Sequence, residues 1–263
     1  MRVLFLGDVV GEPGRSALQA LLPGLQEELE TDAVVVNGEN AAGGRGITPH
    51  LAREMLEQGV SAMTLGDHVW DQAELIPWLN GEQRVLRPFN LQAGTPGFGS
   101  CIVSTPAGEL GVISLMGRTF MRPGAENPFI HGAEEAARMR AAGVLHIIVD
   151  FHAEATSEKV ALGYHLDGLV SLVVGTHTHV QTADERVLPG GTAYLTDAGM
   201  CGSLNGVIGR DAAASLLGYT SGLPSKLPIG GYPARLSGVL LETEAGTGKA
   251  LRVERINRFF DKV

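Results

Sequence analysis

Five short apolar runs of this chain end directly before a carboxylate or histidine, and this repeated arrangement strongly limits how the chain can fold. The polar residues in these positions are Asp8, Glu39 with Asn40, Asp67 with His68, His152, and His177 with His179. Short apolar runs are typical of buried strands. In open α/β sheets, ligands bind beyond the carboxyl ends of the strands. We therefore expect these side chains to meet in one crevice.

Helical patterns separate the apolar runs. Leucines at helical spacing predict a helix over 13–30, with Pro23 as a break or kink. Thr48 followed by Pro49 predicts a helix start, and Gly59 the end of that helix. The remaining helices are expected at 72–79, 133–142, 157–164 and 211–217, the last within a loop-rich stretch over 199–233.

The strand pattern favours two sheets over one doubly wound sheet. Early strands at 3–6, 33–36 and 61–65 alternate with helices, which predicts a mixed sheet. Two hairpins, 101–105 with 110–115 and 237–244 with 251–259, add antiparallel strands. Further strands are expected at 146–151, 169–174 and 193–196. No repeat or linker interrupts the sequence, so we expect a single α/β domain over 1–263.

Composition excludes several classes of protein. The net charge of −9 argues against binding to extended nucleic acid through phosphate contacts. Two cysteines without CxxC spacing fit a reducing compartment. No signal peptide and no apolar run of ~18 residues is visible, so we expect a cytoplasmic protein with no membrane partner.

The ligand types point to a metal centre. Alternation along an extended chain would place His177 and His179 on one face, which favours metal binding there. Each other residue alone also fits an ordinary role, such as a helix cap, a turn or a buried histidine. The five strand ends together are more specific. Imidazoles and carboxylates without cysteine suit Fe, Mn or Zn, and six such ligands suit two ions.

The order of these residues resembles the calcineurin-like metallophosphoesterase superfamily, whose blocks run Asp-x-His, Gly-Asp, Gly-Asn-His, His and Gly-His-x-His. This chain has Val10, Glu39 and Asp67 where that pattern has His, Asp and Asn. With Asn-Gly-Glu-Asn-Ala, Gly-Arg-Thr-Phe-Met and Gly-Thr-His-Thr-His-Val-Gln-Thr, these departures resemble the bacterial YmdB-like branch. The resemblance implies a four-layer α/β/β/α sandwich of two mixed sheets flanked by helices.

The resemblance also implies the roles of the site residues. One metal ion would be held by Asp8, Glu39, Asn40 and His179. The second would be held by Glu39, Asp67, His152 and His177, with Glu39 bridging. Of the metals that suit these ligand types, iron is the one we expect, with manganese or zinc as alternatives. His68 would be the general acid, although it could instead only orient Asp67.

The implied activity is a phosphodiesterase acting on small phosphodiesters, including 2′,3′-cyclic nucleotides. Alternatives are a phosphomonoesterase or nucleotidase, a protein phosphatase, a nuclease on long RNA, and a metal-binding regulatory protein that acts through a partner. Homo-oligomerisation is compatible with the sequence. Arg118 has either a substrate contact or a structural role, and the loop over 199–210, with Asn205 and Arg210, is expected to form a rim.

Overall fold

The first sheet is built around β1 (Arg2–Leu6) in a computed structural model that describes residues 1–262. β1 pairs in parallel with β3 (Ala33–Asn37) and antiparallel with β13 (Ala234–Thr243). The strand order is β2-β12-β13-β1-β3-β4-β5, and β14 also pairs with β13. The other strands are β2 (Asp8–Val9), β4 (Ala62–Thr64), β5 (Val85–Leu86), β12 (Met200–Ser203) and β14 (Ala250–Phe260).

The second sheet has six strands in the order β10-β11-β9-β8-β7-β6. Its centre is formed by β8 (His146–His152) and β9 (Leu172–Thr176), which are parallel. β6 (Ser100–Thr105) and β7 (Gly108–Met116) form the expected hairpin, and β7 is parallel to β8. β10 (Arg186–Val187) and β11 (Ala193–Leu195) complete the other edge.

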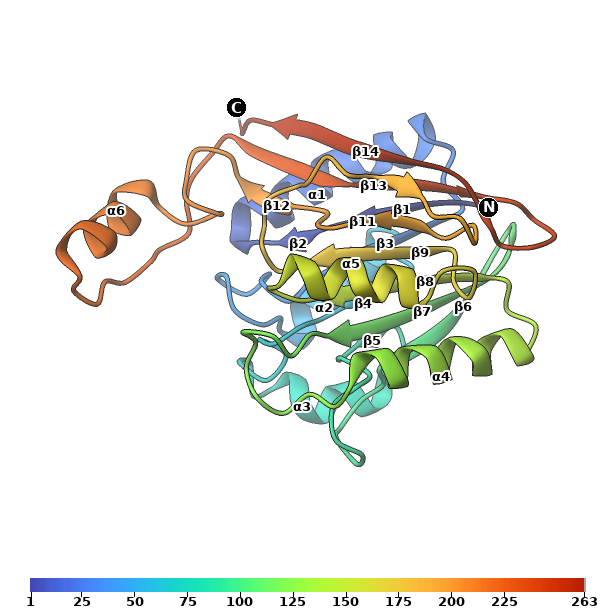
Figure 1. The fold of residues 1–263 in the computed structure, drawn as a ribbon. Coiled ribbons are helices and arrows are strands. Elements are labelled where there is room, and N and C mark those ends of the chain that lie inside the picture. Colours follow the sequence, from blue (N-terminus) through green and yellow to red (C-terminus); the bar gives the residue numbers. More distant parts are fainter. Residues whose placement is uncertain (263) are drawn as a thin grey trace.

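Helices cover the outer face of each sheet (Figure 1). α1 (Gly11–Glu28) and α2 (Pro49–Glu57) share a core with the outer face of the first sheet. α4 (Pro128–Ala141) and α5 (Thr156–His165) share a core with the outer face of the second sheet. The short α3 (Leu75–Trp78) continues into a 3-10 turn over Leu79–Gly81. The α/β/β/α sandwich expected from the sequence is therefore confirmed.

Alternating side chains of β1 explain how the layers hold together. Val3 and Phe5 lie in the core between the two sheets. Leu4 and Leu6 face the other way, into the core beneath α1 and α2. A strand buried on both faces is apolar throughout. This accounts for the continuous apolar run at the start of the chain.

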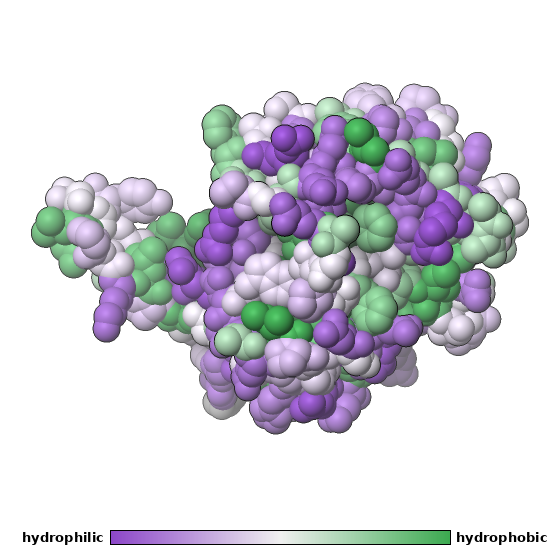
Figure 2. Space-filling view, turned by 90° about the horizontal axis from the view of Figure 1, so that it is seen from below, coloured by the Kyte–Doolittle hydropathy of each residue, from purple (hydrophilic) through white to green (hydrophobic). Residues whose placement is uncertain are grey.

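One helical segment stands away from the sandwich. α6 (Ala212–Ser221) projects to the left of the body in Figure 1, and the same lobe carries apolar side chains in Figure 2. Leu216, Leu217 and Tyr219 are exposed there. Asp211 caps this helix by accepting a hydrogen bond from the backbone of Ala214 at 2.8 Å.

Several expected boundaries were wrong. α4 begins at Pro128, five residues before the predicted start, because the Asn127 side chain caps it by accepting from the Phe129 N–H at 3.0 Å. The helix expected over 72–79 is only the four residues of α3. Of the break or kink expected at Pro23, the break does not occur, because α1 continues through this residue. Within residues 1–262, none of the helices has the length and apolar character needed to cross a membrane.

Candidate metal centre

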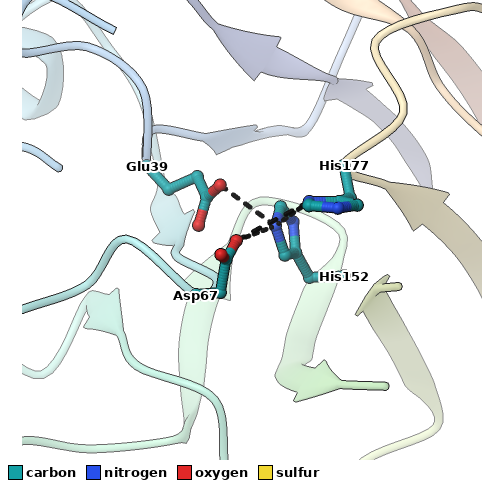
Figure 3. Close-up of side chains that lie close together, drawn as sticks. All are labelled: Glu39, Asp67, His152 and His177. Atoms are coloured by element: carbon teal, nitrogen blue, oxygen red, sulfur yellow. Dashed lines mark hydrogen bonds and ion pairs between the residues drawn. The ribbon is translucent and has the colours of Figure 1, made fainter. Parts of the chain in front are cut away.

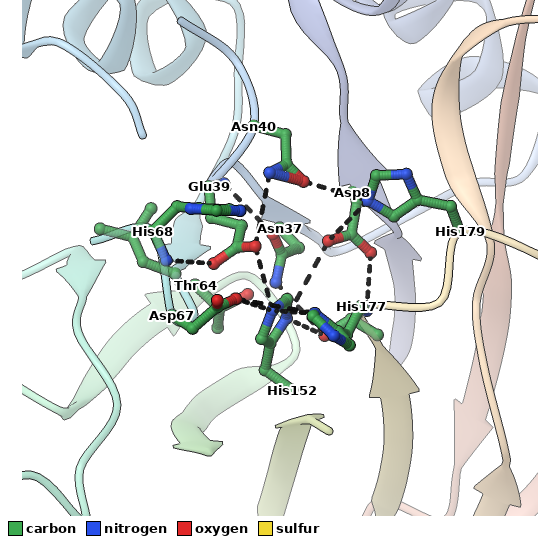
Figure 4. A network of polar contacts seen from close by, with 12 residues as sticks. Asp8, Asn37, Glu39, Asn40, Thr64, Asp67, His68, His152, His177 and His179 are labelled. Atoms are coloured by element: carbon green, nitrogen blue, oxygen red, sulfur yellow. Dashed lines mark hydrogen bonds and ion pairs between the residues drawn. The ribbon is translucent and has the colours of Figure 1, made fainter. Parts of the chain in front are cut away.

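The residues expected at the strand ends do meet at one end of the two sheets (Figure 4). Asp8 begins β2, which Gly7 alone separates from β1, and His152 ends β8. Glu39, Asp67 and His177 each lie one to three residues beyond β3, β4 or β9. A cavity of about 320 Å³ opens onto this region, and its polar lining includes Glu39, Asn40, His68, His177 and His179.

Two carboxylates and two imidazoles form the tightest group (Figure 3). One donor atom from each of Glu39, Asp67, His152 and His177 lies within 4.8 Å of all the others. The His152 Nε2 atom lies 3.0 Å from Glu39 Oε1, 3.2 Å from Asp67 Oδ1 and 3.0 Å from His177 Nδ1. Nitrogen and oxygen donors gathered so closely have the chemistry to hold a transition-metal ion.

A second group of donors surrounds Asp8. The His179 Nε2 atom lies 3.1 Å from Asn40 Oδ1 and 3.7 Å from Asp8 Oδ1. Asp8 Oδ2 accepts a hydrogen bond from the His177 backbone at 3.1 Å. Asp8 Oδ1 is buried and has no hydrogen-bond partner. Such an oxygen is costly to bury, and a bound cation would satisfy it.

The loop after β9 differs from the extended chain that the sequence suggested. β9 ends at Thr176, and His177 and His179 have φ values of 94° and 66°. These left-handed conformations are uncommon for residues other than glycine. The alternation argument for a shared face was therefore wrong, because His177 turns toward His152 and His179 toward Asn40 (Figure 4).

Close packing explains the glycine before Asp67. A Cβ atom on Gly66 would lie 2.2 Å from Cδ2 of His152 and 2.3 Å from Oε2 of Glu39. Both atoms belong to side chains of the tight donor group. A side chain at this position would therefore displace two candidate ligands at once.

Burial and neighbouring charges shift the pKa values within the site. Burial raises the pKa of Asp8 to about 6. Burial lowers the pKa of His177 to about 4, and the adjacent His152 adds to that effect. Burial alone would also lower the pKa of His152, but Glu39 and Asp67 raise it well above its usual value. His177 is therefore neutral near pH 7, with a lone pair available for a metal.

His68 has neighbours that the sequence analysis missed. Its Nδ1 atom lies 2.9 Å from Asp71 Oδ2 and 3.1 Å from Arg122 Nη2. Arg122 Nε also lies 3.2 Å from Asp67 Oδ2. The spacing of three residues between His68 and Asp71 was a usable signal. Arg122 lies in a loop far from His68 in the sequence, and no sequence pattern indicated their contact.

Glu154 was missed as well. Its Oε2 atom lies 3.2 Å from His177 Nε2, and it lines the cavity. Of the residues expected to form a rim, Arg210 lines the cavity together with Ile208, whereas Asn205 does not, and residues 200–203 of the expected loop form β12. Arg118 instead lines a different hollow, where its backbone N–H donates to the Glu158 carboxylate at 3.0 Å.

The four-layer fold with a carboxylate–histidine cluster at its strand ends defines a protein of the metallophosphoesterase class. A family model described as YmdB-like protein matches residues 4–256. The chain belongs to this YmdB-like family. It is 43% identical over 256 residues to the 2′,3′-cyclic-nucleotide 2′-phosphodiesterase of Bacillus subtilis (strain 168), covering 97% of this chain and 96% of that relative.

Two solved structures are similar over nearly the whole chain. A hypothetical protein from Thermus thermophilus aligns with a TM-score of 0.92 and 37% identity, covering 99% of this chain and 100% of the other. A novel phosphatase from Mycoplasma pneumoniae aligns with a TM-score of 0.92 and 34% identity, covering 99% and 94%. The recognition of the YmdB-like branch from sequence motifs is therefore confirmed.

Proposed function

We propose that this protein is a metal-dependent phosphodiesterase that hydrolyses small phosphodiesters, with 2′,3′-cyclic nucleotides as its preferred substrates. The observation that carries the proposal is the convergence of Glu39, Asp67, His152 and His177 within 4.8 Å, beside a cavity that Glu39 and His177 line. The 43% identity with a relative named for 2′,3′-cyclic-nucleotide hydrolysis supports the substrate class. We also assign it to the cytoplasm, where free Cys101 and Cys201 would stay reduced.

Two metal ions fit the two groups of donors. In this proposal, Asp8, Asn40 and His179 hold the first ion, and Asp67, His152 and His177 hold the second. Glu39 would serve both ions, which its position supports, because Oε1 lies 3.0 Å from His152 Nε2 and 3.4 Å from Asn40 Nδ2.

Iron is the metal we assign, with manganese or zinc as alternatives, since the donors are nitrogen and oxygen without thiolate. Bound metal ions would lower the pKa of a coordinated water and offset the negative charge of the phosphate oxygens. The protein itself contributes the orientation of the donors and a proton for the leaving oxygen.

His68 is the proposed source of that proton. It lines the cavity, and Asp71 holds its Nδ1 atom, which leaves Nε2 for the substrate. An alkoxide leaving group needs a proton as the P–O bond breaks, and a positioned imidazole can donate it. With a 2′,3′-cyclic nucleotide, the leaving oxygen stays attached to the ribose of the product.

A panel of substrates tests the proposal. Metal-reconstituted protein should hydrolyse 2′,3′-cyclic AMP and bis-p-nitrophenyl phosphate faster than the monoester p-nitrophenyl phosphate. The monoester arm matters because a relative from Mycoplasma pneumoniae is described as a putative phosphatase/phosphodiesterase. Faster turnover of the monoester would instead identify the protein as a phosphomonoesterase. No turnover of any ester with any of the three metals would refute it.

A further inference from the structure

A polar network lies buried between the two sheets, directly beneath the candidate metal centre. Asn37 and Thr64 reach into it from the first sheet, and Asp150 and Thr176 from the second. All four residues have 0% exposure. Apolar residues of both sheets pack around the network, so these groups require internal hydrogen-bond partners.

Asp150 is the acceptor at the centre of this network. Its Oδ1 atom accepts from the Thr176 hydroxyl at 2.7 Å, and its Oδ2 atom accepts from Asn37 Nδ2 at 2.9 Å and from the Thr64 hydroxyl. Three donors directed at two oxygens fit an ionised carboxylate.

The hydroxyl of Thr176 fixes the proton on His152. A hydroxyl has one hydrogen, and here Asp150 takes it. The Thr176 oxygen can therefore only accept from its other neighbours, which are His152 Nδ1 at 2.9 Å and Asn37 Nδ2 at 3.4 Å. With one proton fixed on Nδ1, Nε2 is the nitrogen that must give up its proton when His152 binds a metal.

The Nε2 atom faces the other candidate ligands. Nε2 of His152 is the atom that lies 3.0 Å from Glu39 Oε1 and 3.2 Å from Asp67 Oδ1. The network reaches Glu39 by a second route, because Asn37 Oδ1 accepts the Glu39 backbone N–H at 3.2 Å. Asp150 is thus linked to candidate ligands that come from both sheets.

We propose that Asp150 is a positioning residue of the metal centre, which acts through Thr176 to direct Nε2 of His152 at the metal and through Asn37 to align Glu39. This inference rests on the proposed metal-dependent function. Hydrogen bonds to the distal nitrogen of a metal-bound histidine commonly fix its tautomer and raise its basicity. Here the Thr176 hydroxyl stands between the Asp150 carboxylate and the His152 ring, and it makes the hydrogen bond that fixes the tautomer.

A pair of substitutions at Thr176 tests the relay. Thr176→Val keeps the shape of the side chain and removes the hydroxyl, whereas Thr176→Ser keeps the hydroxyl. We expect Zn²⁺ affinity, measured by chelator competition without substrate, to fall about 10- to 100-fold in Thr176→Val. Thr176→Ser should bind Zn²⁺ within a few-fold of the wild type.

Thr192→Val is the matched control. Thr192 is also fully buried, and its hydroxyl donates to the Val170 carbonyl at 2.7 Å, but it precedes β11 at the opposite end of the sheet. It should lose stability without a selective loss of Zn²⁺ affinity. Equal affinity losses in both valine variants, or none in Thr176→Val, would overturn the inference.

A measurement on the wild type keeps the inference testable if Thr176→Val does not fold. In the Zn²⁺-loaded protein, ¹⁵N NMR of the histidine rings should find the His152 proton on Nδ1. A proton on Nε2 would overturn the assignment. Because neither measurement uses a substrate, an absence of phosphodiesterase activity would refute the proposed function and leave this inference to be judged separately.

Discussion

His177 and His179 are two residues apart, yet their imidazoles face different groups of donors. The Nδ1 atom of His177 lies 3.0 Å from His152 Nε2, whereas the Nε2 atom of His179 lies 3.1 Å from Asn40 Oδ1. Both residues have positive φ, and Thr178 between them is held by Asp197 through its N–H at 3.2 Å and its hydroxyl at 2.7 Å. This short loop can therefore supply one ligand to each of two metal ions.

The first prediction concerns His68. His68→Ala should lower kcat for 2′,3′-cyclic AMP by about 10²- to 10⁴-fold, because the leaving alkoxide loses its proton donor. Bis-p-nitrophenyl phosphate should be affected less, since its aryl leaving group needs little protonation. The bound metal should stay at wild-type levels, because His68 is outside the tight donor group. Full activity of the variant on the cyclic nucleotide would exclude the acid role.

A second prediction uses the pKa of Asp8. Burial raises it from 3.8 to about 6, so the folded protein without metal binds this proton more tightly than the unfolded chain. The resulting stabilisation is fully present below about pH 3.8 and is lost as the pH rises through about 6. At pH 7.5 the buried charge costs about 3 kcal/mol, and Asp8→Asn removes that cost.

Urea unfolding in the presence of a chelator measures this effect. Asp8→Asn should be more stable than the wild type at pH 7.5, and the difference should shrink as the pH falls from 6 toward 4. Metal should stabilise the wild type more than the variant. A variant that is less stable than the wild type at pH 7.5, or a difference independent of pH, would contradict the account.

Gly66 provides a steric prediction. Gly66→Ala would place a Cβ atom 2.2 Å from His152 and 2.3 Å from Glu39, so we expect at least a 100-fold loss of metal affinity or failure to fold. Gly24→Ala is the control, because nothing lies within 4 Å of that position in α1. The control should gain about 0.5–1 kcal/mol of stability. Normal metal binding by Gly66→Ala would show that this packing is wrong.

Asp67 leads to a prediction about metal preference. Asparagine occupies this position in the superfamily pattern, and the aspartate adds a negative charge that Arg122 partly offsets, 3.2 Å away. Asp67→Asn should lower the preference of the site for harder or more highly charged ions. Metal analysis of protein from cells grown with mixed metals measures this preference. Identical metal content and activity in the variant would remove this hypothesis.

The strand ends were predictable from the sequence because they depend on local patterns. Buried runs followed by Asp8, Glu39 or Asp67 are visible without a structure, and parallel pairing brings their ends together. The loop after β9 was not predictable in the same way. Positive φ at His177 is imposed by tertiary contacts, including the hydrogen bond from its backbone to Asp8.

Long-range contacts also account for the residues that were missed. Arg122 reaches His68 across 54 positions of the chain, and Asp150 reaches Asn37 across 113. Asp150 lies inside an apolar strand, where a single carboxylate has no sequence pattern that reveals its role. Such contacts follow from how the two sheets pack, which local patterns do not specify.

Metal stoichiometry tests the central claim most directly. Protein purified without oxygen and analysed for metals should contain two ions per chain, with iron prominent. His179→Ala should retain about one ion, because only the donors around Asp8 are affected, whereas His152→Ala should lose the second ion and weaken the first through Glu39. One ion or none in the wild type, after reconstitution with excess iron, manganese or zinc, would contradict the dinuclear centre.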